Sequence, residues 1–127
     1  MKVCKKTDLI LCIFICVISV PVFASNMQSE INHLLAILGN SECQFERNGK
    51  MHSGKDTVNH VKKKYNYFKS KINSAEKFIE YSATKSTLSG KYYMVLCKDK
   101  PKIRTQDWLF QELKNYRSKD SLVLMDI

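Results

Sequence analysis

The sequence predicts a small α+β domain in which about four helices pack on a small antiparallel sheet crosslinked by one disulfide. Three observations predict it. Apolar residues recur at helical spacing in several segments. An Asn48-Gly49 pair separates two short β-like runs. Two cysteines lie in the part of the chain that follows a predicted N-terminal export signal. The expected order of elements is α, β, β, α, α, β, α.

Residues 1–24 have the layout of a secretory signal peptide, with a short basic start followed by the apolar run Leu9–Ala24. We expect cleavage after Ala24, so that the mature protein begins at Ser25, is periplasmic or secreted, and has no transmembrane segment. The alternative is an uncleaved membrane anchor, but an apolar run of 16 residues that contains Pro21 is short for a membrane span, which needs about 20 residues.

The first half of the mature chain predicts a helix, a hairpin and a second, longer helix. Asn26 is the expected cap of the first helix, and Gly39 and Asn40 end it. Asn48-Gly49 suits a tight turn with positive φ, and Ser53 resembles the start of a capping box. The expected elements are a helix over 25–38, a strand over 43–47, a returning strand over 50–53 and a helix over about 54–72.

The second half predicts two more helices and one central strand. Ser74 and Glu76 resemble a second cap, and Thr105 is the expected cap of the last helix. The tail 118–127 ends in the apolar run LVLMDI, which we expect to pack as an edge strand; contact with a partner is the alternative. The other expected elements are a helix with Ala75, Phe78, Ile79 and Ala83 inward, a hydroxyl-rich loop over 82–90, a strand over 92–97, and a helix bearing Trp108, Leu109, Leu113 and Tyr116.

The mature chain of 103 residues is expected to form one domain over residues 25–117, followed by the tail. It carries 18 Lys and Arg against 11 Asp and Glu, a net charge of +7. In an exported protein, this excess favours an anionic envelope polymer, a lipid headgroup or an envelope protein over nucleic acid as the partner. The alternative is a lysine-rich surface that is simply solvated.

Cys43 and Cys97 are the two cysteines of the mature chain. An even pair in an oxidising compartment predicts one disulfide, and two separate buried thiols are the alternative. The chain has no Cys-x-x-Cys motif, so the sequence gives no support for oxidoreductase chemistry.

An ordered set of short motifs runs through the mature chain. The motifs are Cys43-x-Phe45-x-Arg47-Asn48-Gly49, His60-Val61-x-x-Lys64, Ala75-Glu76-x-Phe78-Ile79, Ser86-x-x-Ser89-Gly90, Tyr93-x-Val95-x-Cys97 and Trp108-Leu109. This set resembles the YfeK-like family of small secreted proteobacterial proteins, a domain of unknown function. The resemblance covers about residues 29–117 and implies export and Cys43–Cys97 pairing, but no activity. Lys85 in the hydroxyl-rich loop and the apolar tail depart from the family pattern.

Motifs for catalysis, metals and cofactors are missing from the sequence, so no catalytic residue is assigned. His33, His52 and His60 lack metal-ligand spacing. Ser82 and Lys85 match a bare Ser-x-x-Lys, but the companion motifs of penicillin-binding enzymes are not in the sequence. Glu76 and Glu80 share a helix face, and Glu76 is expected to act in a cap.

One side of the long helix predicts a binding face. Its apolar residues share a narrow sector, and the opposite side carries basic residues around an aromatic one, a combination suited to an anionic surface. A merely solvated face is the alternative. The residues of the predicted face are His60, Lys63, Lys64, Tyr67 and Lys71.

These observations favour an exported, non-enzymatic accessory protein that binds an anionic envelope component or a protein partner through this face. The alternative function is a small envelope hydrolase with a site at the Ser82–Gly90 loop near Arg47 and Asn48. A third possibility is an inhibitor of a host or rival hydrolase, although the positive charge disfavours strongly basic targets.

Overall fold

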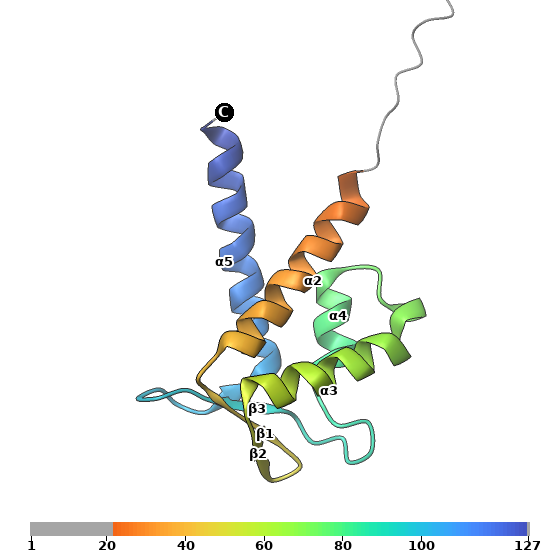
Figure 1. Ribbon diagram of the computed structural model, residues 1–127, viewed down its shortest axis with the longest axis vertical. Helices are drawn as coiled ribbons and strands as arrows, with labels where there is room; N and C mark the ends of the chain where they lie inside the picture. Colours follow the sequence, from red (N-terminus) through yellow and green to blue (C-terminus); the bar gives the residue numbers. More distant parts are fainter. Residues whose placement is uncertain (1–21, 127) are drawn as a thin grey trace, which may run out of the picture.

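The computed structural model describes residues 22–126, with side chains from residue 26 onward, so most of the predicted signal peptide lies outside the described residues. The described chain contains four α-helices and a four-stranded antiparallel sheet, which confirms the predicted α+β class (Figure 1). The elements are α2 (Val22–Asn40), β1 (Gln44–Arg47), β2 (Lys50–His52), α3 (Gly54–Tyr67), the 3-10 turn η2 (Lys69–Lys71), α4 (Ala75–Ser82), β3 (Met94–Leu96), β4 (Ile103–Arg104) and α5 (Thr105–Met125).

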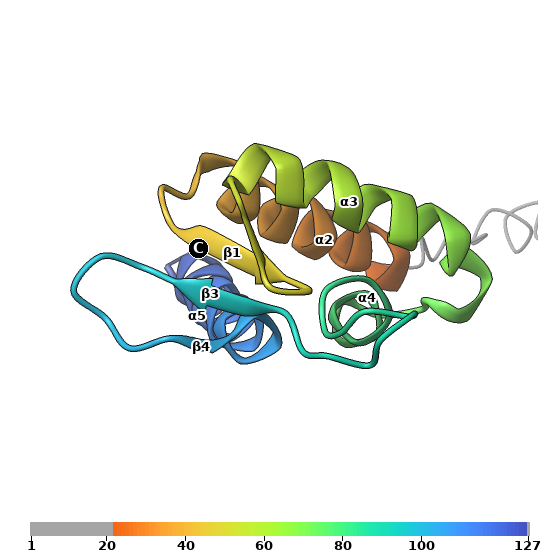
Figure 2. The ribbon, with the colours of Figure 1, turned by 90° about the horizontal axis from the view of Figure 1, so that it is seen from below.

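The sheet has the strand order β2-β1-β3-β4, so the apolar strand β3 is internal, as predicted. Asn48 and Gly49 adopt positive φ at the β1–β2 turn, which is the conformation this pair favours. Phe45 of β1 lies opposite Val95 of β3, and both side chains are buried. Figure 2 shows the sheet lying across one end of the helices, with α5 directly behind it.

The core lies between the helices and the inner side of the sheet. Gly54 brings the start of α3 close to the end of α2, since a Cβ atom at this position would lie 2.2 Å from the carbonyl oxygen of Leu38. The four helices and the sheet all contribute buried side chains, among them Ile31, Leu34, Phe45, Val61, Phe78, Ile79, Val95, Leu109 and Leu113.

The predicted disulfide joins Cys43 to Cys97, immediately before β1 and immediately after β3. The two residues are 54 positions apart in the sequence. Closing a loop of this length stabilises the folded state by about 4 kcal/mol in the chain-entropy treatment. The disulfide therefore ties together two neighbouring strands that are distant in sequence.

The helix boundaries differ from the prediction in three places. α2 begins at Val22 rather than near Ser25, so Asn26 lies inside the helix and is not its cap. α3 ends at Tyr67 instead of continuing to Ile72, because the chain turns through η2 and becomes extended at Ile72, whose side chain is then buried. Thr105 is the first residue of α5 rather than its cap.

The short strand β4 was not predicted, and it explains the position of Thr105. β4 pairs with β3 and leads directly into α5, so the chain passes from strand to helix without a separate capping residue. The backbone N–H of Thr105 donates to the carbonyl oxygen of Tyr93 at 2.9 Å, which places this residue at the edge of the sheet.

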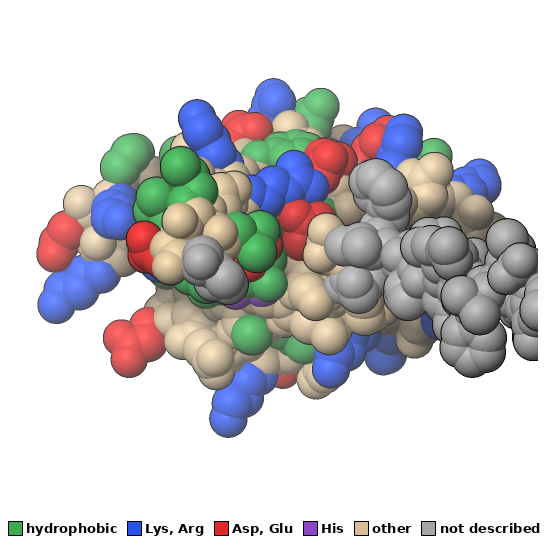
Figure 3. All heavy atoms as spheres, turned by 90° about the horizontal axis from the view of Figure 1, so that it is seen from above, with side chains coloured by type: hydrophobic (Ala, Val, Ile, Leu, Met, Phe, Trp, Pro, Cys, Tyr) green, Lys and Arg blue, Asp and Glu red, His purple; other side chains and the backbone are tan. Residues whose placement is uncertain are grey.

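The expected packing of the tail 118–127 as an edge strand is wrong for the described part of this segment. α5 continues to Met125, and the Ser118 and Ser121 hydroxyls donate to backbone carbonyls four residues earlier. The side chains of Leu122 and Met125 are 62% and 82% exposed. Figure 1 shows the end of α5 projecting away from the domain, and Figure 3 shows hydrophobic side chains gathered around it.

Candidate functional site

The predicted binding face lies on α3, whose position is set at its N-terminus. The Ser53 hydroxyl accepts a hydrogen bond from the backbone N–H of Asp56, as the capping box predicted. Val61 is buried against the core and fixes the rotation of the helix. Lys63 and Tyr67 consequently face away from the core and are exposed, Tyr67 to 81%.

Lys71 is also exposed, but it lies in the 3-10 turn η2 rather than on a continuous helix. Lys63, Tyr67 and Lys71 are therefore all exposed, although Lys71 lies beyond the end of α3. This position follows from the early end of the helix at Tyr67.

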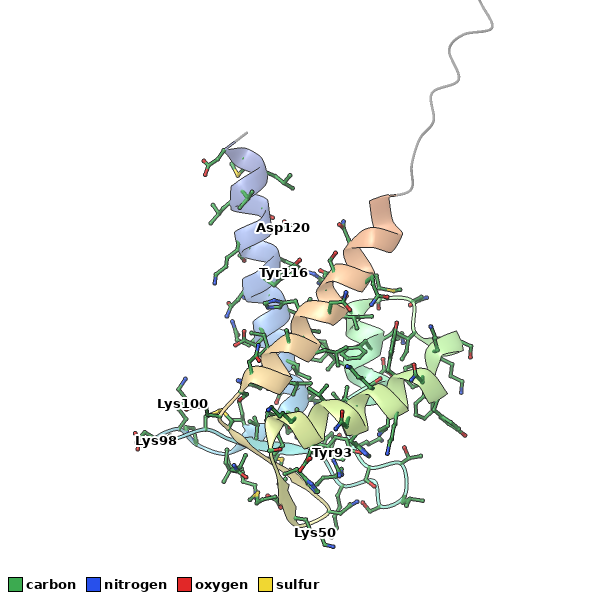
Figure 4. All side chains as sticks on the ribbon, viewed as in Figure 1. Lys50, Tyr93, Lys98, Lys100, Tyr116 and Asp120 are labelled. Carbon is green, nitrogen blue, oxygen red and sulfur yellow. A yellow bond between two sulfur atoms is a disulfide. The ribbon has the colours of Figure 1, made fainter. Side chains whose placement is uncertain are left out.

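His60 and Lys64 differ from the prediction because both are partly buried on the flank of α3. His60 Nε2 lies 3.1 Å from the Tyr93 hydroxyl, and Lys64 Nζ donates to the same hydroxyl at 3.2 Å. Lys64 Nζ also donates to the backbone carbonyl of Lys85 at 2.6 Å. In Figure 4, Tyr93 lies immediately below α3. The helical period alone does not show which flank of a helix a distant loop covers.

The chemistry of Lys64 fixes the direction of its hydrogen bond. The Lys64 ammonium is only a donor, so the Tyr93 oxygen accepts from it. Nε2 of His60 and the Tyr93 hydroxyl also form a hydrogen bond, in which the donor is set by the ring nitrogen that carries the proton of the neutral imidazole. Burial, together with Arg47 and other nearby cations, lowers the pKa of His60 to about 4, which keeps this imidazole neutral near pH 7.

The cations around His60, Lys64 and Tyr93 are not balanced by nearby acids. Burial and then Arg47 lower the pKa of Lys64, whereas burial raises the pKa of Tyr93 against the opposing effect of Arg47. Residues 47–71 contain eight Lys or Arg and one acid, Asp56. The ion pairs of the described residues involve Lys77, Lys102 and Arg117, so none uses a cation of this segment.

The Ser82–Gly90 loop lies against the β1–β2 turn, as the alternative function required. The Asn48 side chain donates to the Ser86 hydroxyl at 3.3 Å and accepts from the Ser89 hydroxyl at 2.6 Å. The Ser86 oxygen also accepts from the backbone N–H of Ser89. These bonds hold the loop in place and give both serine hydroxyls a structural role.

The described geometry does not assemble a serine nucleophile with a base. Among residues 26–126, no hydrogen bond joins a serine of the loop to His60 or Glu76. Ser82 is fully buried. Glu76 does not close a capping box: its carboxylate pairs with Arg117 of α5, and the Ser74 hydroxyl alone caps α4.

An open groove of about 370 Å³ lies beside Lys64, between α3, α4 and the Ser82–Gly90 loop. It combines two lysines, two aromatic rings and several hydroxyl groups. The sequence did not predict it, because its three walls meet only in the folded chain. The lining residues are Lys64, Phe68, Glu80, Tyr81, Lys85, Ser86, Thr87 and Gly90.

Within the described part of the chain, no group of three His, Cys, Asp or Glu side chains is placed to hold a metal ion. No helix over residues 22–126 has the length and apolar character needed to cross a membrane.

The described residues form a small α+β domain with one disulfide. Residues 25–117 match the model of a family of unknown function, DUF5329, and the chain belongs to that family. Over 67 residues the chain is 33% identical to the uncharacterized protein YfeK of Salmonella typhimurium, a match that covers 52% of this chain and 56% of that protein. The resemblance to YfeK-like proteins is thus confirmed, although the match spans little more than half the length of that relative. No solved structure matches the chain.

Proposed function

We propose that this protein is an exported binding protein that contacts an anionic envelope component through the basic face of α3 and η2. The face consists of Lys63, Tyr67 and Lys71, with Lys64 at its edge. The observation that carries the proposal is the excess of seven positive charges in residues 47–71, a segment whose cations form no ion pair in the described structure.

Electrostatics favours an anionic ligand at this face. Several like charges on one surface create a positive potential that attracts anions and is screened by salt. The exposed ring of Tyr67 lies among these cations, and an amphipathic aromatic side chain suits an interface that is partly apolar and partly wet. Both properties support a ligand that presents several negative groups.

Binding is tested with two anionic probes, polyphosphate and phosphatidylglycerol vesicles, at low and moderate salt. The K63E/K71E variant is expected to bind at least about tenfold more weakly, because it replaces two attractive contacts by repulsive ones. The control is K98E/K100E, which makes the same charge change on the exposed β3–β4 loop. Equal weakening in both variants would mean that net charge, rather than this face, determines binding.

Export is supported by the signal-peptide pattern and by the disulfide, because disulfides persist in oxidising compartments. The test is an intact mass of the protein recovered from cells after free thiols are blocked. The expected mass begins at Ser25 and carries no blocking group on Cys43 or Cys97. A full-length mass with both thiols blocked would contradict export.

A further inference from the structure

We propose that the groove beside Lys64 binds a sugar ring that carries a carboxylate or phosphate group. This inference rests on the proposed function, because it names a class of anionic ligand and a groove for it at the Lys64 edge of the basic face. It is carried by the juxtaposition of cations, aromatic rings and hydrogen-bonding groups in one groove.

The anionic group would bind at Lys64 and Lys85. Lys64 Nζ is held in place by the Tyr93 hydroxyl and the Lys85 carbonyl, two hydrogen bonds that use two of the three N–H groups of an ammonium. The side chain of Lys85 is exposed and lines the same groove. A carboxylate or phosphate oxygen between these ammonium groups would gain charge-assisted hydrogen bonds.

The sugar ring would pack on Phe68 and Tyr81. These two rings are partly exposed, and their centroids lie 5.4 Å apart at an interplanar angle of 34°. Together they form an apolar surface next to the cations. The C–H face of a pyranose is apolar and would cover this surface, whereas an inorganic ion would leave it exposed to water.

The remaining groups of the groove match the hydroxyls of a sugar. Glu80 offers carboxylate oxygens and is held by Lys77 at 3.2 Å, so its negative charge is already partnered. Thr87 is exposed and offers a hydroxyl that both donates and accepts. A volume of about 370 Å³ lies at the lower end of the range for small-molecule sites.

The test is calorimetric titration with a galacturonic acid trisaccharide, a neutral glucose trisaccharide, a sugar phosphate and inorganic phosphate. We expect the acidic trisaccharide and the sugar phosphate to bind and to compete with each other, while the neutral sugar and phosphate alone bind at least about tenfold more weakly. A preference for one acidic sugar would identify whether a carboxylate or a phosphate is the natural group.

Two variants locate the binding. K85A removes an exposed charged side chain from the groove and is expected to weaken binding of the acidic trisaccharide about three- to tenfold. The control K91A removes an exposed lysine side chain that does not line the groove, and it is expected to leave that binding unchanged. Y81A removes part of the aromatic surface, and Y92A is its control outside the groove. Circular dichroism shows whether each variant is folded.

The outcomes separate this inference from the proposed function. If polyphosphate binds but neither acidic sugar does, or if K85A and Y81A leave sugar binding unchanged, the sugar site is wrong and the proposed function stands. If none of the anionic probes binds the wild-type protein, both are wrong.

Discussion

His60 is held neutral by its surroundings rather than by a dedicated partner. It is partly buried, and the charged groups that face it from β1 and α3 are cations, Arg47, Lys63 and Lys64. His52 lies nearby on β2, where burial, Arg47 and Lys50 lower its pKa against the opposing effect of Asp56. A positive charge on His60 would be opposed both by burial and by the neighbouring cations, so the imidazole stays neutral in its hydrogen bond with the Tyr93 hydroxyl.

The lowered pKa of His60 predicts a loss of stability in acid. The imidazole has a pKa of about 4 in the folded protein and about 6.5 when unfolded. As the pH falls from 6.5 to 4, the unfolded chain therefore binds the proton first, and the free energy of unfolding decreases. Urea unfolding at several pH values measures this effect, and H60Q is expected to flatten the dependence. An unchanged pH profile in H60Q would contradict the lowered pKa.

Among the described glycines, Gly54 has the least room for a side chain. A Cβ atom would lie 2.2 Å from the backbone oxygen of Leu38 and 3.0 Å from that of Ser41, and neither backbone atom moves easily. G54A is expected to lower the free energy of unfolding by about 1–3 kcal/mol or more, through forced separation of α2 and α3. The control N59A places alanine at an exposed position of α3 and is expected to change stability by less than about 0.5 kcal/mol.

Elements with a strong local signal were predicted correctly. The Asn48-Gly49 turn and the caps at Ser53 and Ser74 were confirmed, since each depends on a few neighbouring residues. β4 was missed because two residues carry too short a pattern and are held by pairing with β3. The end of α3 was misplaced because the burial of Ile72 requires a turn that only tertiary packing imposes.

The end of α5 is an element that folds without tertiary support in the described structure. Its apolar side chains are exposed, in contrast to Leu113 earlier in the same helix, which is 2% exposed. L122S/L124S is therefore expected to leave the thermal unfolding midpoint nearly unchanged. L113A is expected to cost about 2–5 kcal/mol. Strong destabilisation by the double variant would mean that these side chains are buried in the protein in solution.

At the scale of the whole molecule, the positive charge is concentrated rather than spread. The mature chain has a net charge of +7, and residues 47–71 alone have the same net charge. The three-dimensional structure places this segment along β2, α3 and η2, beside the Ser82–Gly90 loop (Figure 2). This basic segment contains the proposed binding face and borders the groove.

Part of this site follows from the sequence and part does not. Helical spacing predicted the exposure of Lys63 and Tyr67 correctly, because the phase of α3 is fixed by its own apolar residues. The inward turn of His60 and Lys64 depends on Tyr93, which is distant in sequence and reaches α3 only after β3 has paired with β1. The groove also forms only when segments distant in sequence come together, so it was not predicted.

The most direct test is to map where an anion binds on the folded protein. Amide chemical shifts are recorded by NMR as short-chain polyphosphate is added to the disulfide-bonded mature chain. We expect the changes to be largest over residues 47–71 and 85–90. The β3–β4 loop serves as an internal control, because it carries Lys98, Lys100 and Lys102 but lies outside the proposed face. Changes centred on that loop, or spread evenly over all lysines, would contradict the proposed binding face.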